Sequence, residues 1–167
     1  MDLYLLRHGV ADEPDASGNM ADADRPLTNK GERRTLATAQ ALRRLEIEFD
    51  LILSSPYLRT RQTAEILADA LDLRKRLEFC ETLAPGGKLR KLITEINSRQ
   101  PEPKSLLLVG HEPALSRLVT LLVWGEAGPG ITLKKGALCK LVTSGLQPGP
   151  CATLEWLLTA NQMSLLA

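Results

Sequence analysis

The sequence predicts an α/β fold in which helices cover both faces of a mostly parallel sheet. Two features of the sequence indicate this class. Short apolar runs alternate with longer segments of helical periodicity, which is the pattern that successive strand–helix units produce. Near the C-terminus, residues 135–142 and 152–158 are expected to form two antiparallel strands that complete the sheet.

The expected elements follow one another in a regular order. The apolar runs predict strands at residues 2–6, 49–53, 76–79 and 105–109. The helical segments predict helices at residues 28–45, 55–71, 87–98 and 113–123. Thr28 and Ser55 are the expected N-caps, with Pro56 at the first position of the second helix. Polar stretches at 11–26 and 125–130 are expected to be loops. No repeat or linker divides the chain, so residues 1–167 are expected to form a single domain.

The composition argues against several classes of function. Of the 167 residues 44% are hydrophobic, and a formal net charge of +1 argues against a nucleic-acid-binding or membrane-surface protein. No apolar stretch approaches the ~20 residues of a membrane span, and the N-terminal run is too short for a signal peptide. Cys80, Cys139 and Cys151 form no CxxC pair, which is typical of reduced thiols. We therefore expect a cytoplasmic protein without a structural metal.

The chain contains two histidines, and each directly follows an apolar strand. The segments read LYLL–Arg7–His8–Gly9 and LLLV–Gly110–His111. Because ligands of open α/β sheets bind outside the carboxyl ends of the strands, both imidazoles are expected to meet at one edge of the sheet. A single histidine of this kind is more often an ordinary loop or core residue. Two together, each beside a glycine that permits a tight turn, favour a shared site.

Two arginines complete the expected site. Arg7 precedes His8, and Arg59 lies in the first full turn of the helix expected from Ser55, where its side chain leans toward the same strand edge. Arg61 is expected to be solvated. A phosphoryl group in transfer spreads negative charge over three oxygens, which arginine can bind with its planar fork, while a neutral imidazole supplies a nucleophile. No carboxylate cluster has metal-ligand spacing, so we expect phosphoryl chemistry without a metal or cofactor.

These segments resemble a known family. In order along the chain, LYLLRHG, SSPYLRTRQTAE and LLLVGHEP resemble the signature of the histidine phosphatase superfamily, which includes phosphoglycerate mutases. The length and the DRPLTNKGERR segment are most similar to its SixA-type phosphohistidine phosphatases. The resemblance covers about residues 1–113. It implies a three-layer α/β/α sandwich, His8 as phosphate acceptor, and Arg7, Arg59 and His111 as phosphate ligands. It also implies two steps through a phosphohistidine intermediate.

The sequence leaves more than one class of substrate open. The resemblance implies a histidine-phosphorylated signalling protein. The rivals are a phosphatase for a small phosphoester or polyphosphate, and a non-catalytic module that binds phosphohistidine, although a binder has no need of His8. An alkoxide leaving group requires a general acid worth roughly 10²–10⁴-fold, whereas a phosphorylated imidazole leaves readily. Glu81 is the one carboxylate near the expected place of such an acid, and its role stays open. The aspartates of the 11–26 loop and the Lys134–Lys135 turn are expected to be solvated.

Overall fold

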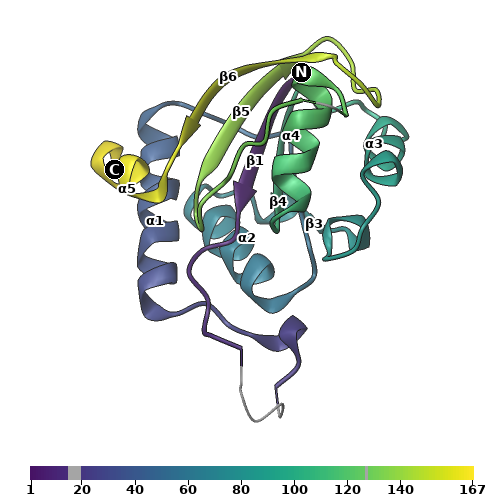
Figure 1. The fold of residues 1–167 in the computed structure, drawn as a ribbon. Coiled ribbons are helices and arrows are strands. Elements are labelled where there is room, and N and C mark those ends of the chain that lie inside the picture. Colours follow the sequence, from purple (N-terminus) through teal and green to yellow (C-terminus); the bar gives the residue numbers. More distant parts are fainter. Residues whose placement is uncertain (15–19, 127) are drawn as a thin grey trace.

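The computed structural model describes residues 1–14, 20–126 and 128–167. Its six-stranded sheet has the order β3-β2-β4-β1-β5-β6 (Figure 1). The strands are β1 (Asp2–Arg7), β2 (Leu51–Ser54), β3 (Leu77–Phe79), β4 (Ser105–Gly110), β5 (Leu138–Thr143) and β6 (Ala152–Leu158). The pairs β1–β4, β2–β4 and β2–β3 are parallel, whereas β5 is antiparallel to both β1 and β6. This confirms the mostly parallel sheet with antiparallel strands near the C-terminus.

Helices cover both faces of the sheet, which makes the fold a three-layer α/β/α sandwich (Figure 1). The helices are α1 (Asn29–Arg44), α2 (Leu58–Ala70), α3 (Leu89–Asn97), α4 (Ala114–Trp124) and α5 (Ala160–Leu166). Short 3-10 turns lie at η1 (Asp22–Asp24), η2 (Arg74–Arg76) and η3 (Glu81–Leu83). Side chains of β1 alternate between the layers: Tyr4 and Leu6 pack against α1, α2 and α5, whereas Leu3 and Leu5 pack against α3 and α4. No helix in the described part of the chain is both long and apolar enough to cross a bilayer.

The start of α1 is fixed to the segment that follows β1. As expected, Thr28 caps the helix, and its hydroxyl accepts the N–H of Gly31 at 3.1 Å. A Cβ atom on Gly31 would lie 2.1 Å from the carbonyl oxygen of Val10, so only glycine permits this approach of helix and loop. The helix thereby supports the residues directly after His8.

Two predictions about the elements were wrong or incomplete. α2 begins at Leu58 rather than at Pro56, and Ser55 does not cap it. The Ser55 hydroxyl is instead oriented toward the site described below, while the peptide segment 55–57 stays outside the helix. Helix α5 was not predicted; it begins with a capping box formed by Thr159 and Gln162. Of the expected loops, residues 15–19 and 127 lie outside the described residues.

Candidate active site

The register of the central strands brings the two histidines together. Arg7 of β1 pairs with Gly110 of β4, so the residues that follow, His8 and His111, leave the sheet side by side. Their ring centroids lie 5.2 Å apart with an angle of 57° between the ring planes. Both side chains are buried, with 6% and 3% of their surface exposed. Two imidazoles that are 103 positions apart in the chain therefore lie together in one buried site at the carboxyl edge of the sheet.

His8 has a defined tautomer. Its Nδ1 lies 2.8 Å from the carbonyl oxygen of Gly9, and because a carbonyl can only accept, Nδ1 carries the proton. The lone pair is then on Nε2. Burial lowers the pKa of His8 to about 4; the Gly9 carbonyl opposes this shift, and the positive charges of Arg59, Arg7 and Lys135 add to it. At neutral pH, His8 is an uncharged imidazole with an available nucleophilic nitrogen.

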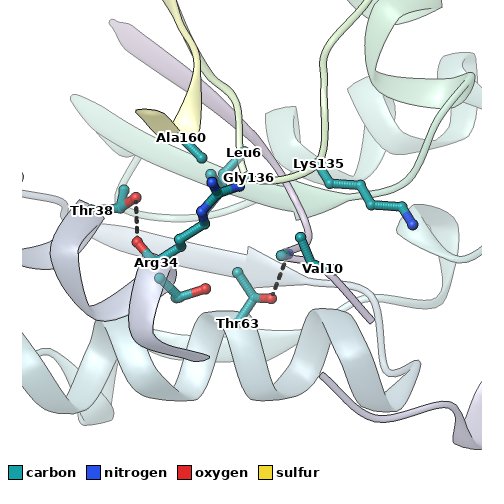
Figure 2. A pocket seen from close by; sticks show the side chains of 10 residues that line it. Leu6, Val10, Arg34, Thr38, Thr63, Lys135, Gly136 and Ala160 are labelled. Carbon is teal, nitrogen blue, oxygen red and sulfur yellow. Dashed lines mark hydrogen bonds between the residues drawn. The ribbon is translucent and has the colours of Figure 1, made fainter. Parts of the chain in front are cut away.

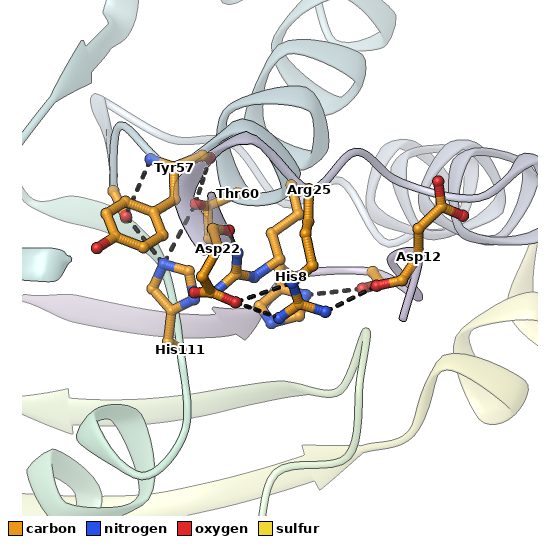
Figure 3. A network of polar contacts seen from close by, with 10 residues as sticks. His8, Asp12, Asp22, Arg25, Tyr57, Thr60 and His111 are labelled. Carbon is orange, nitrogen blue, oxygen red and sulfur yellow. Dashed lines mark hydrogen bonds and ion pairs between the residues drawn. The ribbon is translucent and has the colours of Figure 1, made fainter. Parts of the chain in front are cut away.

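His111 is held by two hydroxyl groups and an aromatic ring. Its Nε2 lies 2.9 Å from Ser55 Oγ and 3.4 Å from Thr60 Oγ1. The ring of Tyr57 packs edge-on against it, with centroids 5.4 Å apart (Figure 3). Burial is the largest cause that lowers the pKa of His111 to about 3, and the nearby His8 and Arg59 lower it further. His111 is therefore also neutral at pH 7.

The two arginines present buried N–H groups that have no partner. Arg7 Nη1 donates to the carbonyl of Leu133 at 2.8 Å, and Arg59 is only 4% exposed, with its guanidinium 5.3 Å from the centroid of the Tyr57 ring. Four buried side-chain nitrogens of the described residues lack a partner, and three of them are Arg7 Nε, Arg59 Nε and His111 Nδ1. Buried polar atoms are normally hydrogen-bonded. Three unpartnered nitrogens on the residues of this site therefore indicate a binding site for an anion that has several acceptor oxygens.

Asp22 is exposed, as expected for the aspartates of the first loop, but it also pairs with Arg59, which the sequence did not predict. Its Oδ2 accepts from Arg59 Nη2 at 2.9 Å, and its backbone carbonyl accepts from Arg59 Nη1 at 2.6 Å. Its Oδ1 accepts from Arg25 Nε at 2.8 Å (Figure 3). Burial alone would raise the pKa of Asp22, but its hydrogen bonds to Arg25 and Arg59, and their positive charges, outweigh burial and lower it. The carboxylate therefore stays ionised and provides an internal anion for Arg59.

Two further residues of the SSPYLRTRQTAE segment connect the site to the rest of the fold. Thr63 Oγ1 accepts the N–H of Gly9 at 3.1 Å and donates to the carbonyl of Arg59 at 2.7 Å. Gln62 Oε1 accepts the N–H of Leu27 at 2.7 Å. Sequence reasoning missed both roles, although the Gln-Thr pair stands inside the segment that carried the resemblance. Helix α2 therefore holds the backbone next to His8 as well as Arg59.

The turn before β5 supports His8 from the other side. The N–H of Gly136 donates to the carbonyls of Arg7 and His8 at 3.2 and 3.0 Å. This places Lys135, expected to be in a solvated turn, close enough for its charge to lower the pKa of His8. Figure 2 shows Arg34, Thr63 and Lys135 around a cavity of only about 10 Å³ beside this turn. Such a volume accommodates one water at most, so this cavity is no ligand site.

The other residues singled out in the sequence are Arg61, Glu81 and the glycines beside the two histidines. Arg61 is solvent-exposed and pairs with Glu65 at 3.0 Å, as expected. Glu81 is exposed on η3 and forms no hydrogen bond or ion pair with the histidines or arginines of the site among the described residues. Gly9 and Gly110 have no left-handed backbone angles, so the tight-turn argument for them was wrong. A Cβ on Gly9 would instead crowd Thr35 Oγ1 at 3.0 Å. Within the described residues, no group of acidic, histidine and cysteine side chains could hold a metal ion.

A buried histidine pair with two arginines, at the strand ends of a three-layer α/β/α sandwich, defines a class of phosphoryl-transfer protein. The sequence profile of the histidine phosphatase superfamily (branch 1) matches residues 3–102, and the chain belongs to this family. His111 lies beyond the matched stretch. Membership of this family gives the chain the chemistry of a phosphatase.

The chain is also similar to individual proteins of this family. The chain is 42% identical to an uncharacterised protein of Picosynechococcus over 142 residues, which cover 84% of each chain. It is 32% identical to the phosphohistidine phosphatase SixA of Escherichia coli, over 90% of this chain and 95% of the relative. Among solved structures, the protein histidine phosphatase SixA complexed with tungstate superposes with a TM-score of 0.78 at 28% identity, covering 96% of this chain and 98% of the other.

Proposed function

We propose that this protein is a metal-independent phosphohydrolase that forms a phosphohistidine intermediate on His8 and acts on histidine-phosphorylated protein. One observation carries the proposal. Neutral His8, its Nδ1 bound to the Gly9 carbonyl, lies beside His111 and within range of the charges of Arg7 and Arg59. The Nε–H groups of both arginines are buried without a protein acceptor, and Nδ1 of His111 is likewise buried without a partner. An oxyanion of tetrahedral shape supplies acceptors to all of them.

In the first step, Nε2 of His8 attacks the phosphorus atom of the substrate in line with the leaving group. The new bond is P–Nε2, and the bond that breaks is the one between phosphorus and the substrate nitrogen, which keeps the electron pair. The developing negative charge on the three oxygens is bound by Arg7, Arg59 and the N–H of His111. Meanwhile the Gly9 carbonyl accepts from Nδ1–H and stabilises the positive charge that forms on the His8 ring.

In the second step, water attacks the phosphorus of phosphohistidine from the side that the leaving group has vacated. The P–Nε2 bond breaks, its electron pair returns to His8, which keeps its Nδ1 proton, and the inorganic phosphate that forms takes both protons of the water. The same donors bind the transferring group in both steps, so one pocket serves both. Neither step requires a metal ion to neutralise the phosphoryl oxygens, because two guanidinium groups already do so.

The proposed substrate class follows from the lack, among the described residues around the site, of a carboxylic acid that could protonate an alkoxide. Glu81 is exposed and outside the contacts of the site. Asp22 contacts Arg59, but the lowered pKa of its carboxyl keeps it ionised. A phosphorylated imidazole needs no such acid, because its ring can already carry the proton. Similarity to the Escherichia coli phosphohistidine phosphatase over most of both chains supports the same substrate class.

The test compares rates on a phosphohistidine peptide with rates on a panel of phosphate monoesters. The expected result is faster turnover of the peptide, together with an acid-labile, base-stable phosphoryl adduct on His8. His8→Ala should abolish both the adduct and the turnover. Hydrolysis by His8→Ala at the wild-type rate would contradict the proposed mechanism. If monoesters were turned over faster, and Glu81→Gln lost activity on monoesters alone, the substrate would instead be a small phosphoester. Binding of the peptide without turnover would identify a recognition module instead.

A further inference from the structure

The tautomer of His111 decides whether this residue attracts or repels a bound phosphoryl group. A neutral imidazole has one N–H, and its other nitrogen carries a lone pair. Nε2 of His111 contacts hydroxyl oxygens of Ser55 and Thr60, whereas Nδ1 is buried without a partner. In Figure 3, Nε2 lies toward Thr60 and the opposite side of the ring lies toward Asp22 and His8. A proton on Nδ1 makes His111 a donor to the anion; a proton on Nε2 leaves only a lone pair facing the anion.

The hydroxyl protons around Nε2 distinguish the two tautomers. Thr60 Oγ1 donates to the carbonyl of Tyr57 at 2.7 Å, so its proton is committed and it can only accept from Nε2. Ser55 is fully buried, and its Oγ already accepts the N–H of Tyr57 at 3.3 Å. Among the described residues, the one acceptor within hydrogen-bond distance of the Ser55 O–H is His111 Nε2, at 2.9 Å. Ser55 is therefore the neighbour that can donate to this nitrogen.

We propose that Ser55 is a positioning residue that holds His111 in the Nδ1–H tautomer, so that the neutral imidazole donates to the phosphoryl group. This proposal rests on the proposed function. With the proton on Nε2, both the Ser55 hydroxyl proton and the Nδ1 lone pair would be buried without a partner. With the proton on Nδ1, only Nδ1–H lacks a partner, and the bound anion supplies it. The same burial that lowers the pKa of His111 to about 3 keeps the ring uncharged, so its tautomer matters.

The position of Ser55 in the fold explains why it can act in this way. Ser54 ends β2 and pairs with Val109 of β4, so Ser55 stands next to Gly110, one residue before His111. The N–H of Ser55 donates to the carbonyl of Val109 at 3.0 Å, which fixes its backbone to β4. The hydroxyl and the imidazole thus belong to residues that directly follow two neighbouring strands, β2 and β4.

The primary test is ¹⁵N NMR of the histidine rings in the full-length protein, with and without tungstate. His111 is expected to show a protonated Nδ1 and an unprotonated Nε2 near neutral pH, and assignment follows from the loss of one spin system in His8→Gln. In Ser55→Ala the ring population should move toward Nε2–H, because Thr60 Oγ1 can accept. The catalytic efficiency of Ser55→Ala toward a phosphohistidine peptide should fall about tenfold to hundredfold, since a hydrogen bond to the charged phosphoryl group is weakened.

Ser54→Ala is the matched control. Ser54 is adjacent and equally buried, but its hydroxyl donates to the Ser55 carbonyl at 3.0 Å and does not contact the imidazole. It should leave the ring tautomer unchanged. A wild-type spectrum with the proton on Nε2, or a Ser55→Ala spectrum identical to wild type, would overturn the proposal. Because these spectra are read without turnover, the proposal for Ser55 can be judged even if the protein hydrolyses no phosphohistidine.

Discussion

Arg59 and Arg61 lie two positions apart near the start of α2 and have opposite surroundings. Arg59 is 4% exposed and presents its unpartnered Nε within the site. The side chain of Arg61 is 54% exposed and lies over the ring of Phe79. The pair therefore provides the same chemical change, arginine to alanine, with and without contact to the site. Each effect on turnover can be assigned to position rather than to the loss of a positive charge from the protein.

Arg59→Ala should reduce kcat by about 10²–10³-fold, because the phosphoryl oxygens lose a preorganised donor in the transition state. Arg61→Ala should stay within about twofold of wild type, since an exposed pair such as Arg61–Glu65 contributes little. Steady-state kinetics on a phosphohistidine peptide measure both. Equal losses in the two variants would mean that α2 acts through its overall charge and not through Arg59.

Asp22→Asn should strengthen product inhibition by inorganic phosphate by roughly threefold to tenfold. Asp22 occupies two N–H groups of Arg59 and places a negative charge beside the pocket, which opposes a second anion. Asparagine keeps a carbonyl oxygen for Arg59 or Arg25 but removes this charge. Inhibition constants for phosphate at constant ionic strength give the comparison. Weaker inhibition in the variant would show instead that the carboxylate mainly orients Arg59 for the anion.

At the scale of elements, the contact of α1 with the segment after His8 gives a prediction with an unusual sign. Glycine inside a helix is ordinarily about 1 kcal/mol less favourable than alanine. Gly31→Ala should nevertheless destabilise the protein by roughly 2 kcal/mol or more, because the new Cβ would lie 2.1 Å from the Val10 carbonyl oxygen and must displace backbone. Urea unfolding measures the change, and reduced turnover should accompany it because Val10 follows the His8 segment.

Gly145→Ala is a suitable control for that experiment, since nothing lies within 4 Å of a Cβ built at this position. It should leave the stability within about 0.5 kcal/mol of wild type. If Gly31→Ala were as stable as wild type, the start of α1 could move without cost, and its role in fixing the loop after β1 would be refuted.

The elements also show what the sequence could and could not predict. Strands were predictable because β1, β2 and β4 are apolar runs buried on both faces, and the chemistry follows directly at their ends. The start of α2 was mispredicted because Ser-Ser-Pro is a common helix start. The partner of the Ser55 hydroxyl is an imidazole 56 positions away, which no local pattern reveals. Asp22 was missed for the same reason: its partner, Arg59, is 37 positions distant.

At the scale of the whole molecule, two buried neutral histidines make stability depend on pH. The pKa is about 4 for His8 and about 3 for His111 in the folded protein, against about 6.5 for an unfolded chain. As the pH falls below about 6.5, the unfolded state binds protons that the native state does not, so stability decreases. At about pH 5 each histidine should cost on the order of 2 kcal/mol relative to neutral pH.

Urea unfolding of wild type and His111→Gln at about pH 7 and about pH 5 tests this linkage. The loss of stability between the two pH values should be smaller in the variant, by on the order of 2 kcal/mol. Carboxylates elsewhere contribute equally to both proteins and cancel in the difference. Identical pH slopes would show that the pKa of His111 is the same in the native and the unfolded state, so that burial does not lower it.

The pairing of β1 with β4 at the middle of the sheet has a consequence for how activity is lost. Both imidazoles extend from inner strands that cannot separate unless the two hydrophobic cores open together. Partial opening at the periphery, for example at α5 or β6, leaves the pair of histidines intact. Residual activity in denaturant should thus decline along the same curve as global tertiary structure. The enzyme would then have no populated form that is folded yet inactive through separation of its two histidines.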